Sequence, residues 1–165
     1  MEFQKGAFPS ATNLPILTDE ERHEVGICYK EKGPQFAEQL GFELVSGPIK
    51  EKRLERWANF LSKSPDALLY CFRGGLRSET ACSWLLTAGF DVPRIEGGYK
   101  QLRNHLLLVF EKLPSLVIVS GRTGTGKTDF LADFTQSIDL EGLANHRGSA
   151  FGGRITPQPA QINFE

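Results

Sequence analysis

The sequence has almost no net charge, because 19 lysine and arginine residues balance 20 aspartate and glutamate residues. This balance argues against a nucleic-acid binder that works through bulk positive charge, although it leaves room for a local basic groove. The chain also lacks an apolar run near the roughly 20 residues that a membrane-spanning helix needs. It opens without the segments of a signal peptide. We therefore expect a cytoplasmic protein with no membrane partner.

Cysteine is scarce and follows no framework spacing. The three cysteines, Cys28, Cys71 and Cys82, are an odd number, which argues against a disulfide scaffold and favours a reducing compartment. Cys28 lies in a charged helical region and Cys82 lies among apolar residues of a predicted helix, so both are interpreted as structural thiols. No set of metal ligands is predicted.

Strand-like and helical segments alternate along the chain. Short apolar runs at 67–71, 92–95 and 116–119 are typical of buried strands. Thr18, followed three residues later by Glu21, predicts a capped helix start. The predicted helices cover residues 18–32, 35–40, 51–61, 77–88, 99–112 and 127–136. This alternation predicts an α/β fold built from parallel strand–helix–strand units.

The alternation falls into two sets that meet at Pro114. We predict a first domain over residues 1–113 and a second over residues 114–165. The second set is short of the roughly 100–150 residues of a typical domain, so we expect only its N-terminal part here. The abrupt start and end of the chain predict truncation at both ends.

Cys71 ends one predicted strand and is followed by a glycine-containing loop and a helix start. The candidate anion-binding loop comprises Phe72, Arg73, Gly74, Gly75, Leu76, Arg77 and Ser78. Backbone N–H groups of such a loop, the positive helix end and the two arginines would together hold an anion and stabilise a thiolate. The alternative is a buried structural cysteine before an ordinary turn.

A phosphate-binding motif of the form G-x-x-x-x-G-K-[ST] follows the predicted strand 116–119 and opens a helix. Its residues are Gly121, Arg122, Thr123, Gly124, Thr125, Gly126, Lys127 and Thr128. The loop N–H groups can wrap a diphosphate, Lys127 supplies a positive charge, and Thr128 could ligate Mg²⁺. ATP, GTP, another diphosphate or an RNA phosphate would all fit, and a glycine-rich turn is the alternative.

Two further segments lie near this motif in the sequence. His146 and Arg147 begin a basic, glycine-rich stretch that could contact a phosphate or RNA, with a surface loop as the alternative. Asp139 and Glu141 are weak candidates for the acidic group that accompanies such phosphate loops, with a solvated strand end as the alternative.

The Cys71 loop resembles those of rhodanese-like sulfurtransferases and Cys-x5-Arg phosphatases. Cys71 through Arg77 has the seven-residue length of the phosphatase loop, whereas the sulfurtransferase loop is usually one residue shorter. Glu2-Phe3, Gly6-Ala7 and residues 11–15 also resemble the opening motif of rhodanese domains, without the strand that usually precedes it. The resemblance implies a persulfide on the cysteine of a sulfurtransferase and a phosphocysteine in a phosphatase.

A cysteine loop of this kind joined directly to a phosphate-binding loop is an unusual pairing. With segments 70–78, 93–100, 120–128 and 138–149, the chain resembles the tRNA 2-selenouridine synthase family. The resemblance implies a rhodanese-like parallel-sheet domain followed by the start of a P-loop α/β domain. It also implies a transferase that replaces sulfur by selenium in the wobble 2-thiouridine of tRNA. Selenophosphate would supply the selenium, and a geranylated intermediate would be made from geranyl diphosphate.

The resemblance further assigns roles to the two loops. Cys71 would receive or relay selenium, the loop with Arg77 would hold selenophosphate, and the loop with Lys127 would hold the geranyl donor. Expected partners are tRNAs of the Lys, Glu and Gln type and an enzyme that supplies selenophosphate, with no tightly bound cofactor. Two alternatives stay open: a Cys-x5-Arg phosphatase or sulfurtransferase, and a non-catalytic fragment that binds RNA or nucleotides.

Overall fold

The fold is described from a computed structural model that covers residues 2–148 and 150–164. Ser149, in the last of the segments that carry the family resemblance, lies outside the described residues. The chain divides into two compact units. The first contains Glu2 and Ser10–Leu106, and the second contains Phe3–Pro9 and the described residues from Leu107 onward.

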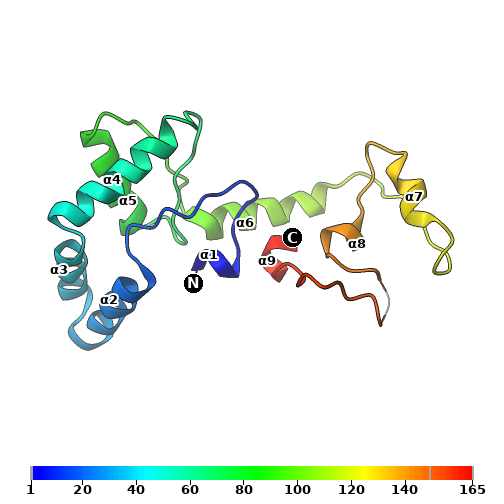
Figure 1. Cartoon of the computed structure of the whole chain (residues 1–165), viewed down its shortest axis with the longest axis horizontal. Helices are drawn as coiled ribbons and strands as arrows, with labels where there is room; N and C mark the ends of the chain where they lie inside the picture. The colour runs from blue at the N-terminus through cyan, green and yellow to red at the C-terminus, as the bar shows by residue number, and fades with distance from the viewer. Residues whose placement is uncertain (1, 149, 165) are drawn as a thin grey trace. The chain divides into compact units, whose positions relative to one another are not determined.

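Helices build most of the regular structure in the first unit (Figure 1). They are α1 (Glu2–Lys5, whose last three residues belong to the second unit), α2 (Asp19–Lys32), α3 (Pro34–Leu44), α4 (Gly47–Leu61), α5 (Leu76–Thr87) and α6 (Gly98–Val109, which runs on into the second unit). Helices α2 and α3 follow one another after a break at Gly33 and pack side by side.

The start of α2 confirms the predicted cap. The Thr18 hydroxyl accepts a hydrogen bond from the Glu21 N–H at 3.2 Å, and the Glu21 carboxylate accepts one from the Thr18 N–H at 2.7 Å. The same carboxylate binds Arg53 of α4 at 2.7 Å, and Arg53 also donates to the carbonyl of Ile16. One capping residue therefore joins two helices and the segment that leads into α2.

The core of the first unit lies between α4 and α5. It is centred on the buried residues Trp57, Ala81 and Leu85. Partly buried apolar residues surround them: Leu14, Ile16, Leu54, Leu61, Leu69, Trp84, Phe90 and Val92. The Trp57 indole N–H donates to the Leu14 carbonyl at 3.1 Å, so the core also holds the segment before α2.

The predicted α/β fold with a parallel sheet is wrong for the described residues. The two expected strands of the first unit meet only in an isolated parallel bridge between Leu69 and Arg94. In this bridge the Leu69 N–H donates to the Pro93 carbonyl and the Ile95 N–H donates to the Leu69 carbonyl, both at 2.9 Å. The ladder stops there because the chain turns at Gly97 and Gly98 into α6.

The second unit contains short helices: η1 (Phe110–Lys112), α7 (Lys127–Ala132), α8 (Leu140–Leu143) and α9 (Gln161–Phe164). The predicted strand 116–119 forms no strand in the described structure, and the exposed fractions of Val117 and Ile118 are 91% and 86%. A parallel strand needs a neighbouring strand and cover on both faces, and this segment has neither among the described residues. The expected P-loop α/β architecture is therefore also wrong for the described residues, because they contain no sheet in this unit.

Several helix bounds also differ from the predicted ones. Helix α4 begins four residues before the predicted start at 51, because Pro48 occupies its first turn, where a missing N–H costs nothing. Helix α3 continues to Leu44 instead of stopping at 40, and α7 ends at Ala132 instead of 136.

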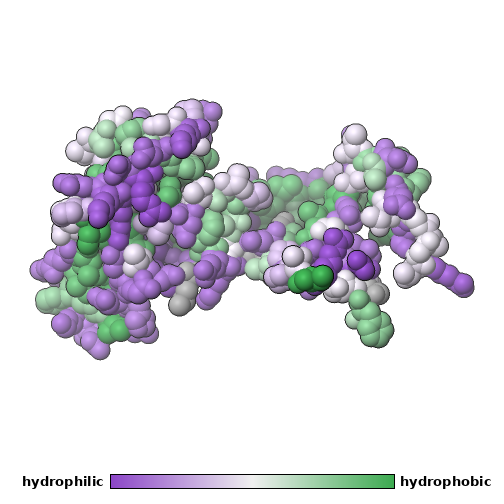
Figure 2. Space-filling model, viewed as in Figure 1, coloured by the Kyte–Doolittle hydropathy of each residue, from purple (hydrophilic) through white to green (hydrophobic). Residues whose placement is uncertain are grey.

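The surface mixes polar and apolar residues, and Figure 2 shows apolar residues at the surface of both units between larger hydrophilic areas. Within the described residues, no helix has both the length and the apolar character needed to cross a membrane.

Two neighbouring leucines on α5 provide a test of this core. The Leu85 side chain is 2% exposed and the Leu86 side chain is 63% exposed. We expect Leu85→Ala to lower the free energy of unfolding by about 2–5 kcal/mol, because it leaves a cavity beside Trp57. We expect Leu86→Ala to change it by no more than about 0.5 kcal/mol. Urea denaturation followed by tryptophan fluorescence measures both, and equal losses would contradict the described packing.

Candidate active site

The backbone of Cys71 is held by the first turn of α6. The Tyr99 N–H donates to the Cys71 carbonyl at 3.0 Å, and the Lys100 N–H donates to the Phe72 carbonyl at 3.1 Å. The aromatic rings of Phe72 and Tyr99 stack at 5.9 Å between centroids. These contacts fix the point at which the chain leaves the short bridge and enters the loop.

The Cys71 loop packs backbone against backbone on the turn that precedes α6. Gly74 has a positive φ of +66°, and a Cβ added to it would lie 2.5 Å from the N atoms of Gly97 and Gly98. A Cβ added to the buried Gly98 would collide with the Cys71 carbonyl and with Gly74. Both positions therefore require glycine, for conformation and for space.

Arg94 fixes the outer side of the loop. Its Nη1 donates to the Gly74 carbonyl at 2.5 Å and forms an ion pair with Glu79 of α5 at 3.2 Å. The sequence reasoning did not single out Arg94, although it lies in segment 93–100, which carries part of the family resemblance. A signal from spacing alone could not have shown that it reaches Gly74.

Ser78 is the closest polar side chain to the thiol. It is 1% exposed, and its Oγ lies 3.3 Å from Cys71 Sγ. The thiol donates to this oxygen, and the Ser78 hydroxyl donates to the Gly75 carbonyl at 2.9 Å. After the thiol loses its proton, the hydroxyl can turn and donate to the sulfur instead.

The surroundings of Cys71 favour the thiolate. Burial raises the pKa of its thiol, but the Ser78 hydroxyl, the backbone N–H groups of Arg73 and Ser78, and the charge of Arg77 outweigh burial and lower the pKa below its usual value. Cys82 shows the opposite balance, because burial raises the pKa of its thiol above the usual value. Of these two cysteines, Cys71 is the one placed to act as a nucleophile.

The phosphate-binding motif forms an exposed loop that leads into α7. Lys127 bends back over this loop, and its Nζ donates to the carbonyls of Gly121 at 3.0 Å and Arg122 at 2.9 Å. The Thr125 hydroxyl also donates to the Arg122 carbonyl at 2.9 Å. Gly121, Gly124 and Gly126 all have positive φ. The lysine thus lies across its own loop, while the ligand of this loop stays a prediction.

Several described residues on either side of α8 make polar contacts within the second unit. His146 forms an antiparallel bridge with Gly153, and its Nδ1 accepts from the Gly148 N–H at 3.0 Å. Asn145, which the sequence reasoning missed, donates to Thr156 Oγ1 at 2.8 Å. Asp139 caps α8 by accepting from the Gly142 N–H at 3.0 Å. A contact of His146 or Arg147 with RNA or phosphate stays a prediction.

No group of three or more histidine, cysteine or acidic side chains that could hold a metal ion occurs in the part of the chain that the structure describes.

Comparison with known proteins finds relatives that match the whole of this chain. A family model described as the tRNA 2-selenouridine synthase AAA domain matches residues 114–165. A tRNA 2-selenouridine synthase from Shewanella sp. (strain MR-7) is 56% identical over 168 residues, which cover 100% of this chain and 46% of the relative. Over its whole length, the chain is thus similar to part of a tRNA 2-selenouridine synthase.

Other relatives show the same similarity. The tRNA 2-selenouridine synthase of Marinobacter nauticus is 54% identical and also covers 100% of this chain. The chain spans about half the length of the curated relatives it matches, 46% for both relatives named here.

One solved structure is also similar. It is the crystal structure of the N-terminal domain of a protein from Clostridium difficile 630 described as ATP/GTP binding. It matches with a TM-score of 0.54 and 32% identity, over 64% of this chain and 81% of that domain.

Ser78 provides a test of the thiol geometry. We expect Ser78→Ala to raise the pKa of Cys71, because the thiolate loses its side-chain hydrogen bond. The midpoint of the pH profile for alkylation by iodoacetamide should then move to higher pH, and the rate at neutral pH should fall severalfold. Ser83→Ala, an exposed position on the same helix, is the matched control. An unchanged midpoint in Ser78→Ala would show that Ser78 does not stabilise the thiolate.

Proposed function

We propose that the chain carries the reactive loops of an enzyme that replaces sulfur by selenium in the wobble 2-thiouridine of tRNA. The observation that carries this proposal is the Cys71 thiol, which lies 3.3 Å from the buried Ser78 hydroxyl and whose pKa is lowered. The similarity of the chain to tRNA 2-selenouridine synthases supports tRNA as the substrate.

Selenophosphate fits the chemistry of the Cys71 loop. It is a tetrahedral oxyanion, and backbone N–H groups with the Arg77 guanidinium are the donors that such an anion prefers. Attack of the thiolate on selenium would have to expel phosphite, which is a poor leaving group. Attack on phosphorus forms the sulfur–phosphorus bond, breaks the phosphorus–selenium bond and releases selenide with its electron pair. Cys71 would thus relay selenium by freeing it beside the base, and water would then release phosphate from the cysteine.

The loop around Lys127 suits the preceding step. Geranyl diphosphate carries its reactive carbon next to a diphosphate, and Lys127 can neutralise the charge that develops when the diphosphate leaves. Transfer of the geranyl group to the sulfur of 2-thiouridine makes that sulfur a better leaving group. Selenide can then attack the base carbon and displace the geranylated sulfur. Mg²⁺ at Thr128 would assist in the same way. ATP or GTP is the competing ligand for this loop.

Removal of the thiol tests the first step. We expect Cys71→Ser to abolish formation of 2-selenouridine from geranylated tRNA and selenophosphate, because serine is not ionised at neutral pH. Cys82→Ser should retain activity, since the Cys82 thiol donates to the Val92 carbonyl at 3.7 Å and burial raises its pKa. Nucleosides are measured by mass spectrometry, in this chain and in the Shewanella relative with the matching substitutions. Selenouridine formed at the normal rate by Cys71→Ser would rule out the proposed role.

Removal of the lysine tests the second step. We expect Lys127→Ala to lower the rate of tRNA geranylation by at least about 100-fold, because the leaving diphosphate loses its positive partner. Lys112→Ala, an exposed position in η1, should leave the rate unchanged. Undiminished geranylation in Lys127→Ala would favour a nucleotide as the ligand of this loop. Hydrolysis of aryl phosphates as the main activity of the chain would favour a Cys-x5-Arg phosphatase.

A further inference from the structure

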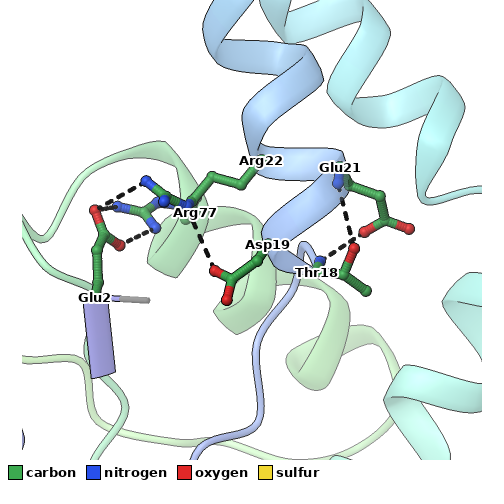
Figure 3. Close-up of polar contacts among 6 residues, drawn as sticks. All are labelled: Glu2, Thr18, Asp19, Glu21, Arg22 and Arg77. Atoms are coloured by element: carbon green, nitrogen blue, oxygen red, sulfur yellow. Dashed lines mark hydrogen bonds and ion pairs between the residues drawn. The ribbon is translucent and has the colours of Figure 1, made fainter. Parts of the chain in front are cut away.

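The opening segment of the chain reaches the anion-binding loop through one side chain. Glu2 Oε2 lies 2.6 Å from Arg77 Nη1, and Glu2 Oε1 lies 3.4 Å from Arg77 Nη2 (Figure 3). Arg77 is the second residue of α5 and directly precedes Ser78, whose hydroxyl contacts the Cys71 sulfur. The contact joins residues that are 75 positions apart in the sequence.

A second arginine holds the same carboxylate. Arg22 of α2 approaches Glu2 at 3.7 Å and Asp19 at 3.9 Å, so guanidinium groups from α2 and α5 both approach the Glu2 carboxylate (Figure 3). Burial raises the pKa of Glu2, but the hydrogen bond and charge of Arg77 and the charge of Arg22 lower it below its usual value. The carboxylate is therefore ionised at neutral pH.

The exposure of the pair limits its role in stability. The Glu2 and Arg77 side chains are 33% and 34% exposed, and ion pairs that water reaches contribute little to the free energy of unfolding. A planar guanidinium bound through both terminal nitrogens is, however, fixed in orientation. An arginine that is already oriented loses less conformational freedom when an anion binds.

We propose that Glu2 is a positioning residue for the anion site beside Cys71. It binds the terminal nitrogens of Arg77 and thereby holds the guanidinium in one orientation beside the loop. Arg22 approaches both Glu2 and Asp19, so two arginines are balanced by two carboxylates, and the role of Glu2 is to orient Arg77. The inference rests on the proposed function only for the premise that the Cys71 loop binds an oxyanion.

Inorganic phosphate is a suitable probe, because its binding in the loop should protect Cys71 from iodoacetamide. We expect Glu2→Ala to raise the phosphate concentration for half-protection roughly three- to tenfold, since Arg77 loses its fixed orientation. Glu2→Asp, which keeps the carboxylate, should recover part of this loss. Glu24→Ala, at an exposed glutamate of α2, is the matched control and should behave as the unmodified chain.

A double-mutant cycle with Arg77→Ala separates positioning from a general effect on the fold. We expect Glu2→Ala to have no further effect on phosphate protection when Arg77 is already alanine. A full effect in that background, or tighter phosphate binding in Glu2→Ala alone, would overturn the proposal. Failure of phosphate to protect the unmodified chain would also overturn it, whether or not selenouridine is formed. If the cycle behaves as expected but no selenouridine is formed, the proposed function fails and the role of Glu2 stands.

Discussion

The close approach of two backbone segments, the Cys71 loop and the Gly97–Gly98 turn, determines the rest of the candidate site. Neither Gly74 nor Gly98 has room for a Cβ, and the Tyr99 N–H holds the Cys71 carbonyl across the same contact. Because this contact fixes the start of the loop, it also fixes where α5 begins and therefore where Ser78 meets the sulfur. The reactivity of the thiol depends on glycine positions that carry no chemistry themselves.

The same contact explains why the first unit has a bridge instead of a sheet. The chain near Arg94 runs parallel to Leu69 for one pair of hydrogen bonds and then turns into α6. The residues after the turn still bind the strand-like segment, but through N–H groups at the start of a helix. A helix start offers unpaired N–H groups, so it can replace the next rungs of a ladder at the cost of ending the strand.

Local features of the sequence predicted local structure well. Thr18 and Glu21 form the expected cap, and the glycines after Cys71 indicated the loop. Both features depend only on residues that are close together in the sequence. The predicted strands were wrong because an apolar run such as 116–119 becomes a strand only beside a partner, which is a property of the whole fold. For the same reason spacing could not reveal the contacts of Glu2 with Arg77 or of Arg94 with Gly74, which join distant residues.

Cys71 and Cys82 show what separates a reactive thiol from a structural one in this chain. Burial acts in the same direction on both, since it raises the pKa of each thiol. At Cys71 the Ser78 hydroxyl, two backbone N–H groups and the charge of Arg77 together lower the pKa by more than burial raises it, whereas at Cys82 the charge of Arg94 does not outweigh burial. Most of these donors are held by the loop backbone, so salt screens them less than it screens an exposed charge. The nearly neutral composition of the chain is therefore compatible with the proposed anion site beside Cys71.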